Sequence, residues 1–517
     1  MRAKRSRLNT DISIQTLDSD SSEDNAECSG PTNINDKFSD NSHQLMLPSA
    51  IIGDFDLNLP TLEASVEPEI VKNNKLVDPA YSNLPKDNAS SSTTQLMNVQ
   101  QFLSSWSLKH QVSHVAVNDL LKYFQNHFPE LPGDARTLLK TGRNVETKPI
   151  ASGNYYHFGI KKCIINLYSK HIAFFKNLNT FELDINIDGL PLSKSSNSQV
   201  YPILCKLKNI HSDVDMIGIY HGYEKPKNAN DFLETCVLDI IDHINNGIDI
   251  HGQNYAVKLN SFICDVPAKS FITYTKGHSG YASCTKCKTE GDYIANRICF
   301  PESIDNLNLR TDQDYRSKVQ ESHHHGTSIL ENIPGINMVD SFALDYMHLV
   351  CLGVVKKMLV TLWCCGKPST KLSFHVINGI SEFLLNISKN VPLEFNRKPR
   401  SLNEVKRWKA TEFRMFLFYI GPVALKNKLS SDRYLNFLSL HVAMIILSSK
   451  NHFSLIDYAA DLLKYYVNTF KILYGAEHIS HNVHNLLHLT DDVKKFGPLD
   501  NFTSLLFTVN IKKNKET

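Results

Sequence analysis

The pattern of apolar and polar positions divides the chain into segments of different character. Residues 1–95 are rich in Ser, Asn, Asp and Pro, and their apolar patches are short and aperiodic. Such a segment cannot bury enough apolar surface to offset the entropy lost on ordering, so we predict a disordered, acidic and polar tail. In residues 96–150 apolar positions recur at helical spacing, and Asp134 precedes the run ARTLLK as a helix start. This segment is predicted to be a small helical module.

Residues 151–275 change to alternating and short apolar runs, which are typical of strands. One amphipathic helix, FLETCVLDIIDHINNGI, interrupts this pattern. Several strands before one helix, and a further strand after it, predict an α/β (α+β) sheet domain. The runs interpreted as strands are YYHFGI, CIINLY, FELDINID, VYPILCKL, DMIGIYHGY, SFICDV and KSFITYT.

The pattern becomes helical again over residues 336–490, beginning with LDYMHLVCLGVVKKMLVTLW. Between the two domains, residues 276–335 contain a Cys-X-X-Cys motif and a polar loop. No stretch of about eighteen uncharged apolar residues occurs, so we expect no membrane partner.

Cysteine content, net charge and one basic run bear on the compartment in which the protein is expected. The eleven cysteines are odd in number and unevenly spread, which does not resemble a disulfide framework. In a reducing compartment a Cys-X-X-Cys motif is instead typical of a metal or redox element. The net charge of +2 does not itself indicate nucleic-acid binding. The N-terminal run MRAKRSR resembles a nuclear localisation signal, so a nuclear protein is expected, and otherwise a cytoplasmic one.

Two aspartates directly follow apolar runs that end in the sheet domain. Asp188 follows FELDINI and Asp265 follows SFIC. Carboxylates that converge at a sheet edge can hold a pair of Mg²⁺ ions for phosphoryl chemistry. The alternative for Asp188 is a hairpin turn, because Asp-Gly is a common turn dipeptide.

Cys284 and Cys287 have the spacing of two ligands of one tetrahedral Zn²⁺ ion. A second pair of ligands is needed. It could come locally from His278 and Cys299, or from the distant pair His484 and His488, one helical turn apart. A redox role is less favoured, because no thioredoxin-like context surrounds the motif.

Asp345 and His348 open the most apolar helical run. Asp345 there is equally a helix cap, and a histidine on a half-buried helix is more often a core residue than a ligand. The triple histidine at 323–325 lies in a polar stretch and is predicted to be a solvated loop.

Taken in order, these motifs resemble the eukaryotic cut-and-paste transposases of the DDE class, in particular CACTA-related, transposable-element-derived proteins. The resemblance spans residues 102–507. The strings that carry it are LPGDARTLLK, INIDGLPLSKS, VYPIL, DVPAKSFI, GHSGYASCTKC, LDYMHLVCLGVVKKML, RWKATEFRMFLFYIGPVALK and NVHNLLHLTDDVKKFGPLDNF.

The resemblance implies an RNase H-like core interrupted by a long all-helical insertion, with residues 491–517 as the truncated end of the core. It implies Asp188 and Asp265 as catalytic residues that bind Mg²⁺, and Asp345 and His348 as a family signature. It implies transposon-end DNA as the partner, with self-association. The zinc ligands that it implies are Cys284, Cys287, His484 and His488.

In the same family, a glutamate completes the catalytic triad shortly after the string that reads GPLDNF here. Thr508 occupies that place. A hydroxyl cannot replace the charge of a carboxylate, so we expect Mg²⁺-dependent DNA strand cleavage and transfer to be strongly reduced or absent. The alternatives are a catalytically dead DNA- or protein-binding remnant and a non-functional, truncated gene-model fragment.

Overall fold

The computed structural model describes most of the chain after residue 97. The predicted tail, the MRAKRSR run and Thr508 lie outside the described residues. The described ranges are 98–110, 112–141, 146–175, 178–192, 195–208, 213–302 and 307–507.

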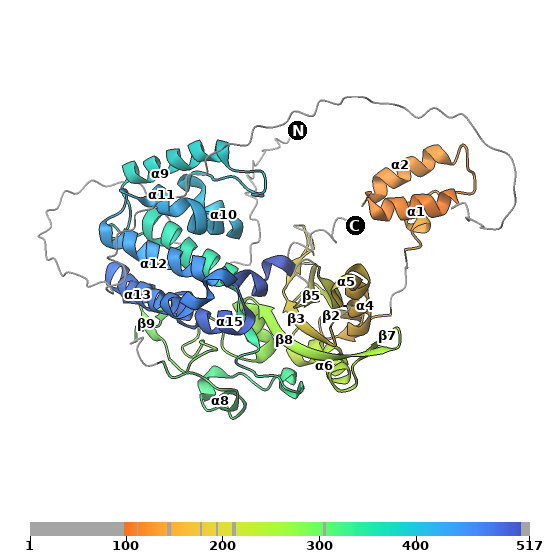
Figure 1. Ribbon diagram of the computed structural model, residues 1–517. Helices are drawn as coiled ribbons and strands as arrows, with labels where there is room; N and C mark the ends of the chain where they lie inside the picture. Colours follow the sequence, from red (N-terminus) through yellow and green to blue (C-terminus); the bar gives the residue numbers. More distant parts are fainter. Residues whose placement is uncertain are drawn as a thin grey trace, which may run out of the picture. The chain divides into compact units, whose positions relative to one another are not determined.

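A mixed β-sheet organises the first half of the described chain, as the α/β pattern predicted (Figure 1). Its strand order is β1-β2-β6-β5-β3-β8-β11, with β4 paired to β5 and β7 paired to β8. Neighbours from β1 to β3 are antiparallel, whereas β8 is parallel to both β3 and β11. The strands are β1 (Lys148–Ile150), β2 (Gly153–His157), β3 (Thr180–Ile187), β4 (Leu190–Pro191), β5 (Gln199–Leu207), β6 (Asp215–Gly222), β7 (Ile248–Ile250), β8 (Gln253–Cys264) and β11 (Phe342–Leu344).

The two faces of this sheet differ in chemistry. Because side chains alternate along a strand, Leu183, Ile185 and Ile187 of β3 point into the hydrophobic core, where α4 (Ile160–Lys170) and α6 (Ala229–Asn246) cover the sheet. The other face carries Asp184, which lies 3.5 Å from the ammonium of Lys206 on β5.

The chain's last described segment covers this polar face. The Lys206 ammonium donates a hydrogen bond to the carbonyl of Asn501, and Phe507 is fully buried. This face therefore carries a buried ion pair beside apolar residues such as Leu204, and residues far apart in sequence meet there.

Two runs interpreted as strands are helices. CIINLY lies in α4, whose buried residues Ile160, Cys163, Ile164 and Leu167 follow helical spacing. KSFITYT lies largely in α7 (Val266–Thr273). Within six or seven residues an apolar run does not distinguish strand from helix, which explains the error. The predicted amphipathic helix is confirmed as α6.

The predicted helical region begins with a strand instead. β11 forms the edge of the sheet, and the helices follow it. They are η4 (Met347–Val355), η5 (Lys357–Cys364), α9 (Phe374–Ile387), η6 (Ser388–Asn390), η7 (Leu402–Arg407), α10 (Ala410–Met415), η8 (Phe416–Ile420), α11 (Gly421–Leu425), α12 (Ser431–Leu447), η9 (Lys450–Leu455), α13 (Ile456–Tyr474), η10 (Ala476–His478), α14 (His481–Asn485), η11 (Leu486–His488), α15 (Leu489–Phe496) and η12 (Leu499–Phe502).

Shorter elements complete the described chain. The helical module contains α1 (Val99–Lys109), α2 (His114–Phe124) and α3 (Ala135–Leu138), and Asp134 caps α3 as predicted, accepting from the amide of Arg136. The remaining elements are α5 (Ile172–Phe175), the hairpin β9 (Asp292–Ile294) and β10 (Arg297–Cys299), α8 (Asp312–Arg316), η2 (Glu321–His323) and η3 (Ile329–Asn332).

One helix in the described part of the chain, Met347–Cys364, is long and apolar enough by length and composition to cross a membrane. Of the residues in this helix, 56% are buried inside the protein. Leu359 and Leu362, for example, are fully buried. Apolar packing therefore explains its composition.

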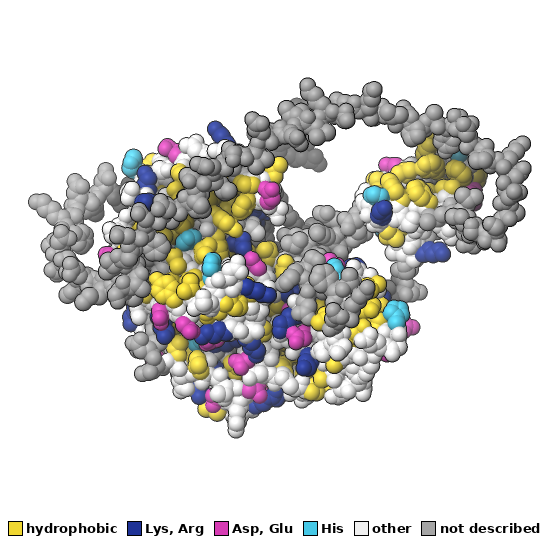
Figure 2. Space-filling view, viewed as in Figure 1, with side chains coloured by type: hydrophobic (Ala, Val, Ile, Leu, Met, Phe, Trp, Pro, Cys, Tyr) yellow, Lys and Arg dark blue, Asp and Glu magenta, His cyan; other side chains and the backbone are white. Residues whose placement is uncertain are grey.

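Charged side chains are mixed on the molecular face shown in Figure 2. Lys and Arg lie among Asp and Glu there, in keeping with the net charge of +2. This view does not single out one continuous basic patch.

Candidate metal centre and carboxylate cluster

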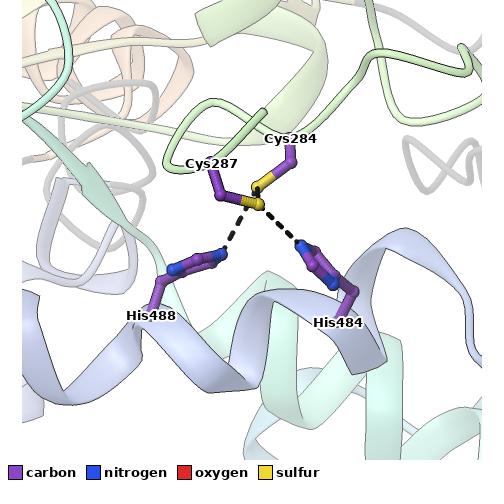
Figure 3. A group of neighbouring side chains, drawn as sticks. All are labelled: Cys284, Cys287, His484 and His488. Atoms are coloured by element: carbon purple, nitrogen blue, oxygen red, sulfur yellow. Dashed lines mark hydrogen bonds between the residues drawn. The ribbon is translucent and has the colours of Figure 1, made fainter. Parts of the chain in front are cut away.

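Four side chains from distant parts of the chain form a buried Cys₂His₂ cluster (Figure 3). Cys284 and Cys287 come from a loop after α7, whereas His484 and His488 come from α14 and η11. Their possible ligand atoms all lie within 4.8 Å of one another. The distant histidines thus complete the group, and His278 and Cys299 are not members of it.

The spacing of these atoms fits one tetrahedral ion. The two Sγ atoms are 3.5 Å apart, Cys284 Sγ is 3.5 Å from His488 Nε2, and Cys287 Sγ is 3.2 Å from His484 Nε2. Zinc bonds of ~2.0–2.3 Å in a tetrahedron place ligand atoms ~3.3–3.8 Å apart. The cluster can therefore hold a metal such as zinc.

The electrostatic setting favours a thiolate at this cluster. Burial opposes ionisation of Cys284, but hydrogen bonds from Cys287 and from the backbone amides of Lys286 and Cys287 lower its pKa to about 7. A nearby guanidinium, that of Arg310, acts in the same direction. A deprotonated thiol is the form that ligates a metal.

Close contacts support each half of the cluster. Arg310 donates from Nη2 to the carbonyls of Cys284 and Cys287, at 3.4 and 3.0 Å. Phe300 stacks on the His484 ring with centroids 4.9 Å apart. Gly353 of η4 permits the approach of α14, because a Cβ there would lie 2.6 Å from the Asn482 amide.

A second site arises at one end of the sheet. Asp188, Asp265 and Asp345 each directly follow a strand, namely β3, β8 and β11, and these three strands are parallel neighbours. Because the carboxyl ends of parallel strands lie at the same sheet edge, the three aspartates gather there. We refer to these three residues and His348 as the carboxylate cluster.

Asp188 and Asp265 each keep one oxygen uncommitted. Asp188 Oδ1 accepts from the amide of Gly189 at 2.7 Å, and Asp265 Oδ1 accepts from Ala268 at 2.8 Å as the N-cap of α7. Their other oxygens have no hydrogen-bond partner within the described part of the chain. The hairpin-turn alternative for Asp188 is wrong, because Ile187 pairs with Ile203 and Leu190 with Val200, so the chain continues along β5 past Asp188 instead of reversing.

Asp345 is in contrast fully engaged. Its Oδ2 accepts from His348 Nδ1 and from the hydroxyl of Ser504, both at 2.5 Å, and its Oδ1 accepts from Thr503, from the amide of Ser504 and from Met347. Asp345 is buried, whereas His348 is half-buried. Asp345 therefore orients His348.

The charges of the cluster act on one another. Burial and the neighbouring charge of Asp265 raise the pKa of Asp188 to about 7. Burial disfavours protonation of His348, but its hydrogen bond to Asp345 and the charges of the three aspartates raise its pKa to about 9. His348 is therefore an imidazolium at neutral pH, whereas Asp188 is only partly ionised there.

The trio of Ser504, His348 and Asp345 does not form a nucleophilic triad. Both partners approach the same ring nitrogen, since Ser504 Oγ lies 3.4 Å and Asp345 Oδ2 lies 2.5 Å from His348 Nδ1. A base that activates a hydroxyl needs its second nitrogen for the orienting carboxylate.

The prediction that the triple histidine is a solvated loop is wrong for His323, whereas His324 is half-buried and His325 is exposed. His323 is completely buried, and its Nδ1 lies 2.6 Å from the carbonyl of Ala282. Burial, together with the positive charge of Arg310, lowers the pKa of His323 to about 3, so the ring is neutral.

Several residues that hold these sites were not recognised in the sequence. Thr503 and Ser504 bind Asp345, and Asp492 binds both Lys286 and the amide of Leu344. Short polar residues in a helical segment carry no signal of such distant contacts.

Comparison with known proteins assigns no family. No protein-family model matches this chain, and no curated protein matches it. Its function must be inferred from its residues.

Proposed function

We propose that this chain is a DDE transposase-like protein of transposable-element origin, with an RNase H-like core and an incomplete site for Mg²⁺-dependent DNA strand cleavage and transfer. One observation carries the proposal. Three aspartates expected from the resemblance directly follow three adjacent parallel strands.

The sheet supports an RNase H-like core. Its central order is β6-β5-β3-β8-β11, in which β5 runs antiparallel to both neighbours and the last three strands are parallel. In this order β3, the first strand of the proposed core, lies in the middle of the sheet, beside β8, which Asp265 follows.

The carboxylate cluster has the chemistry that the proposed reaction requires. The uncommitted oxygens of Asp188 and Asp265 would hold the metal, since carboxylate oxygens are the ligands that Mg²⁺ prefers. When bound, Mg²⁺ would activate the attacking hydroxyl or water and stabilise the leaving oxygen. Asp345 holds His348 as a cation beside these carboxylates, where it can attract a phosphate.

The site offers only two uncommitted carboxylates in the described part of the chain, because both oxygens of Asp345 are engaged. The resemblance expects the third at the position of Thr508, whose hydroxyl carries no charge. We therefore expect feeble metal retention and little or no strand cleavage.

The remaining parts of the proposal follow the resemblance. DNA is the partner, the nucleus is the site of action, and Zn²⁺ is the ion of the Cys₂His₂ cluster. Thiolate and imidazole ligands in a closed, buried tetrahedron favour zinc in a structural rather than a catalytic role.

Manganese binding and plasmid nicking would test this function. We expect the zinc-loaded full chain to bind Mn²⁺, and Asp188→Asn or Asp265→Asn to reduce the affinity about tenfold or more. Asp242→Asn, at an exposed position of α6, is the matched control and should leave the affinity unchanged. Thr508→Glu should raise metal-dependent nicking of supercoiled plasmid above that of the parent.

Two outcomes would count against the proposal in different ways. Equal Mn²⁺ affinity of the parent and both aspartate variants would remove the metal site. Normal Mn²⁺ binding without nicking, even in Thr508→Glu, would favour the second candidate, a DNA- or protein-binding remnant without catalysis.

A further inference from the structure

We propose that the two residues between the cysteine ligands, Thr285 and Lys286, couple the Cys₂His₂ cluster to the carboxylate cluster, so that metal binding by the cysteines and histidines positions Asp265 and Asp345. The effect on divalent-metal binding rests on the proposed function, whereas the structural coupling does not.

Thr285 contacts the helix that begins at Asp265. Lys269 lies one turn into α7 and is almost fully buried, and its Nζ donates to the hydroxyl of Thr285 at 3.1 Å. Asp265 is the N-cap of the same helix. The position of the Cys-X-X-Cys loop is therefore linked to the first turn of α7, and through it to the backbone of Asp265.

Lys286 reaches the strand that ends at Asp345. Its Nζ donates to Asp492 Oδ1 at 2.7 Å, and the other oxygen of Asp492 accepts from the amide of Leu344 at 2.7 Å. Leu344 is the last residue of β11. One buried carboxylate thus joins the metal loop to the residue that precedes Asp345.

The amide of Leu344 needs this partner. β11 is the edge of the sheet, and the backbone donors of an edge strand that do not face β8 have no strand to bind. A buried amide without an acceptor costs about 1–3 kcal/mol. Asp492 satisfies this donor and thereby fixes the end of β11.

The ion pair between Lys286 and Asp492 is buried and therefore costly to break. The side chains of Lys286 and Asp492 are only 8% and 4% exposed, so removing either partner leaves an uncompensated buried charge. Asp492 also follows His488 by four residues along the chain, from η11 into α15. Both ends of the pair are thus adjacent to metal ligands, and an ion bound there holds both ends.

Hydrogen exchange would measure the coupling without any catalytic readout. We expect zinc removal from the full chain to speed amide exchange in peptides covering residues 342–348 and 265–269. A peptide covering β6 should be unaffected, which separates local loosening from global unfolding. Cys284→Ser should reproduce the effect without a chelator.

The double variant Lys286→Met with Asp492→Asn isolates the link. It removes both charges together, and the asparagine oxygen can still accept from Leu344. We expect it to retain zinc, while exchange at 342–348 no longer responds to zinc and Mn²⁺ affinity falls about tenfold. Lys286→Arg keeps the ion pair and should preserve the coupling. Lys208→Met, which removes a half-exposed lysine directly after β5, is the control.

The coupling would be overturned if exchange at 342–348 ignored zinc in the parent, or if the double variant kept the parent's zinc dependence. Failure of the proposed function would look different. In that case exchange would still respond to zinc, but Mn²⁺ affinity would be the same in the parent and in Asp188→Asn.

Discussion

At the scale of single residues, Asp188 carries the electrostatic conflict of the carboxylate cluster. Burial and the charge of Asp265 raise its pKa to about 7, so its ionised form is disfavoured in the folded protein. The unfolded chain loses this proton near the ordinary value of 3.8 whereas the folded protein keeps it up to about pH 7, so the fold loses stability as pH rises between these two values. A bound divalent cation would relieve that cost.

This conflict predicts a pH dependence of divalent-metal binding. A metal ligand must be deprotonated, so protons compete with the ion below the pKa of Asp188. Between about pH 8 and about pH 6, Mn²⁺ affinity should fall about tenfold, as expected for one competing proton. Titrations of Mn²⁺ by electron paramagnetic resonance would measure it, and Asp188→Asn should remove most of the dependence. A flat profile in the parent would show that Asp188 is not a ligand.

At the scale of elements, Asp265 has two roles that substitution can separate. It caps α7 by accepting from Ala268, and it presents its other oxygen at the sheet edge. Asparagine can keep the cap but not the charge, whereas alanine loses both.

We predict that Asp265→Ala lowers the free energy of unfolding by about 1 kcal/mol, the usual worth of an N-cap, while Asp265→Asn leaves it nearly unchanged. Both should lose Mn²⁺ binding. Urea unfolding followed by circular dichroism would compare the stabilities. If Asp265→Asn were as unstable as Asp265→Ala, the charge rather than the cap would stabilise this end of the sheet.

Elements also show where sequence patterns are ambiguous. CIINLY and SFIC are both short and apolar, yet the first lies in α4 and the second in β8. The longer run IKKCIINL, from Ile160 to Leu167, has apolar residues at helical spacing. Only a window of this length distinguishes a helix from a strand. β11 has three residues, too few for any period, and its pairing with β8 alone makes it a strand.

At the scale of the whole molecule, the Cys₂His₂ cluster joins segments about 200 residues apart, since Cys284 Sγ contacts His488. An ion bound there closes a long loop that includes β11 and the helices up to α14. Binding to the folded form alone stabilises that form by mass action.

We predict that zinc removal lowers the thermal unfolding midpoint by about 5–10 °C, which corresponds to a few kcal/mol at this size. Calorimetry with and without a chelator would measure the change, and added Zn²⁺ should restore the midpoint. Elemental analysis of Cys284→Ser should find no zinc, and chelation should then have no further effect.

Cys299→Ser is the matched control for this prediction. Cys299 is also fully buried, but its thiol contacts the carbonyl of Glu477 and lies outside the cluster. It should keep a full complement of zinc. Loss of zinc from this variant would show that the ligand set is different.

The sequence by itself determined the residue types of both sites and the mixed α/β class. Asp188 and Asp265 follow apolar runs, and Cys284 and Cys287 have a chelating spacing, because these signals are local. The residue spacing alone left His278 and Cys299 open beside His484 and His488, and the resemblance favoured the distant pair. Only the tertiary structure brings the ligand atoms of that pair next to the cysteines, since a metal site is defined by distance in space.

The tertiary structure alone decided which residues support these sites. Asp492 reaches Lys286 and Leu344, and Ser504 reaches Asp345, across more than 140 residues of chain in each case. Sequence periodicity reports contacts within a helix or strand, whereas these hydrogen bonds depend on how the last helices return to the sheet edge. The physical reason is that burial, which makes such polar contacts strong, is a property of the folded chain and not of its local pattern.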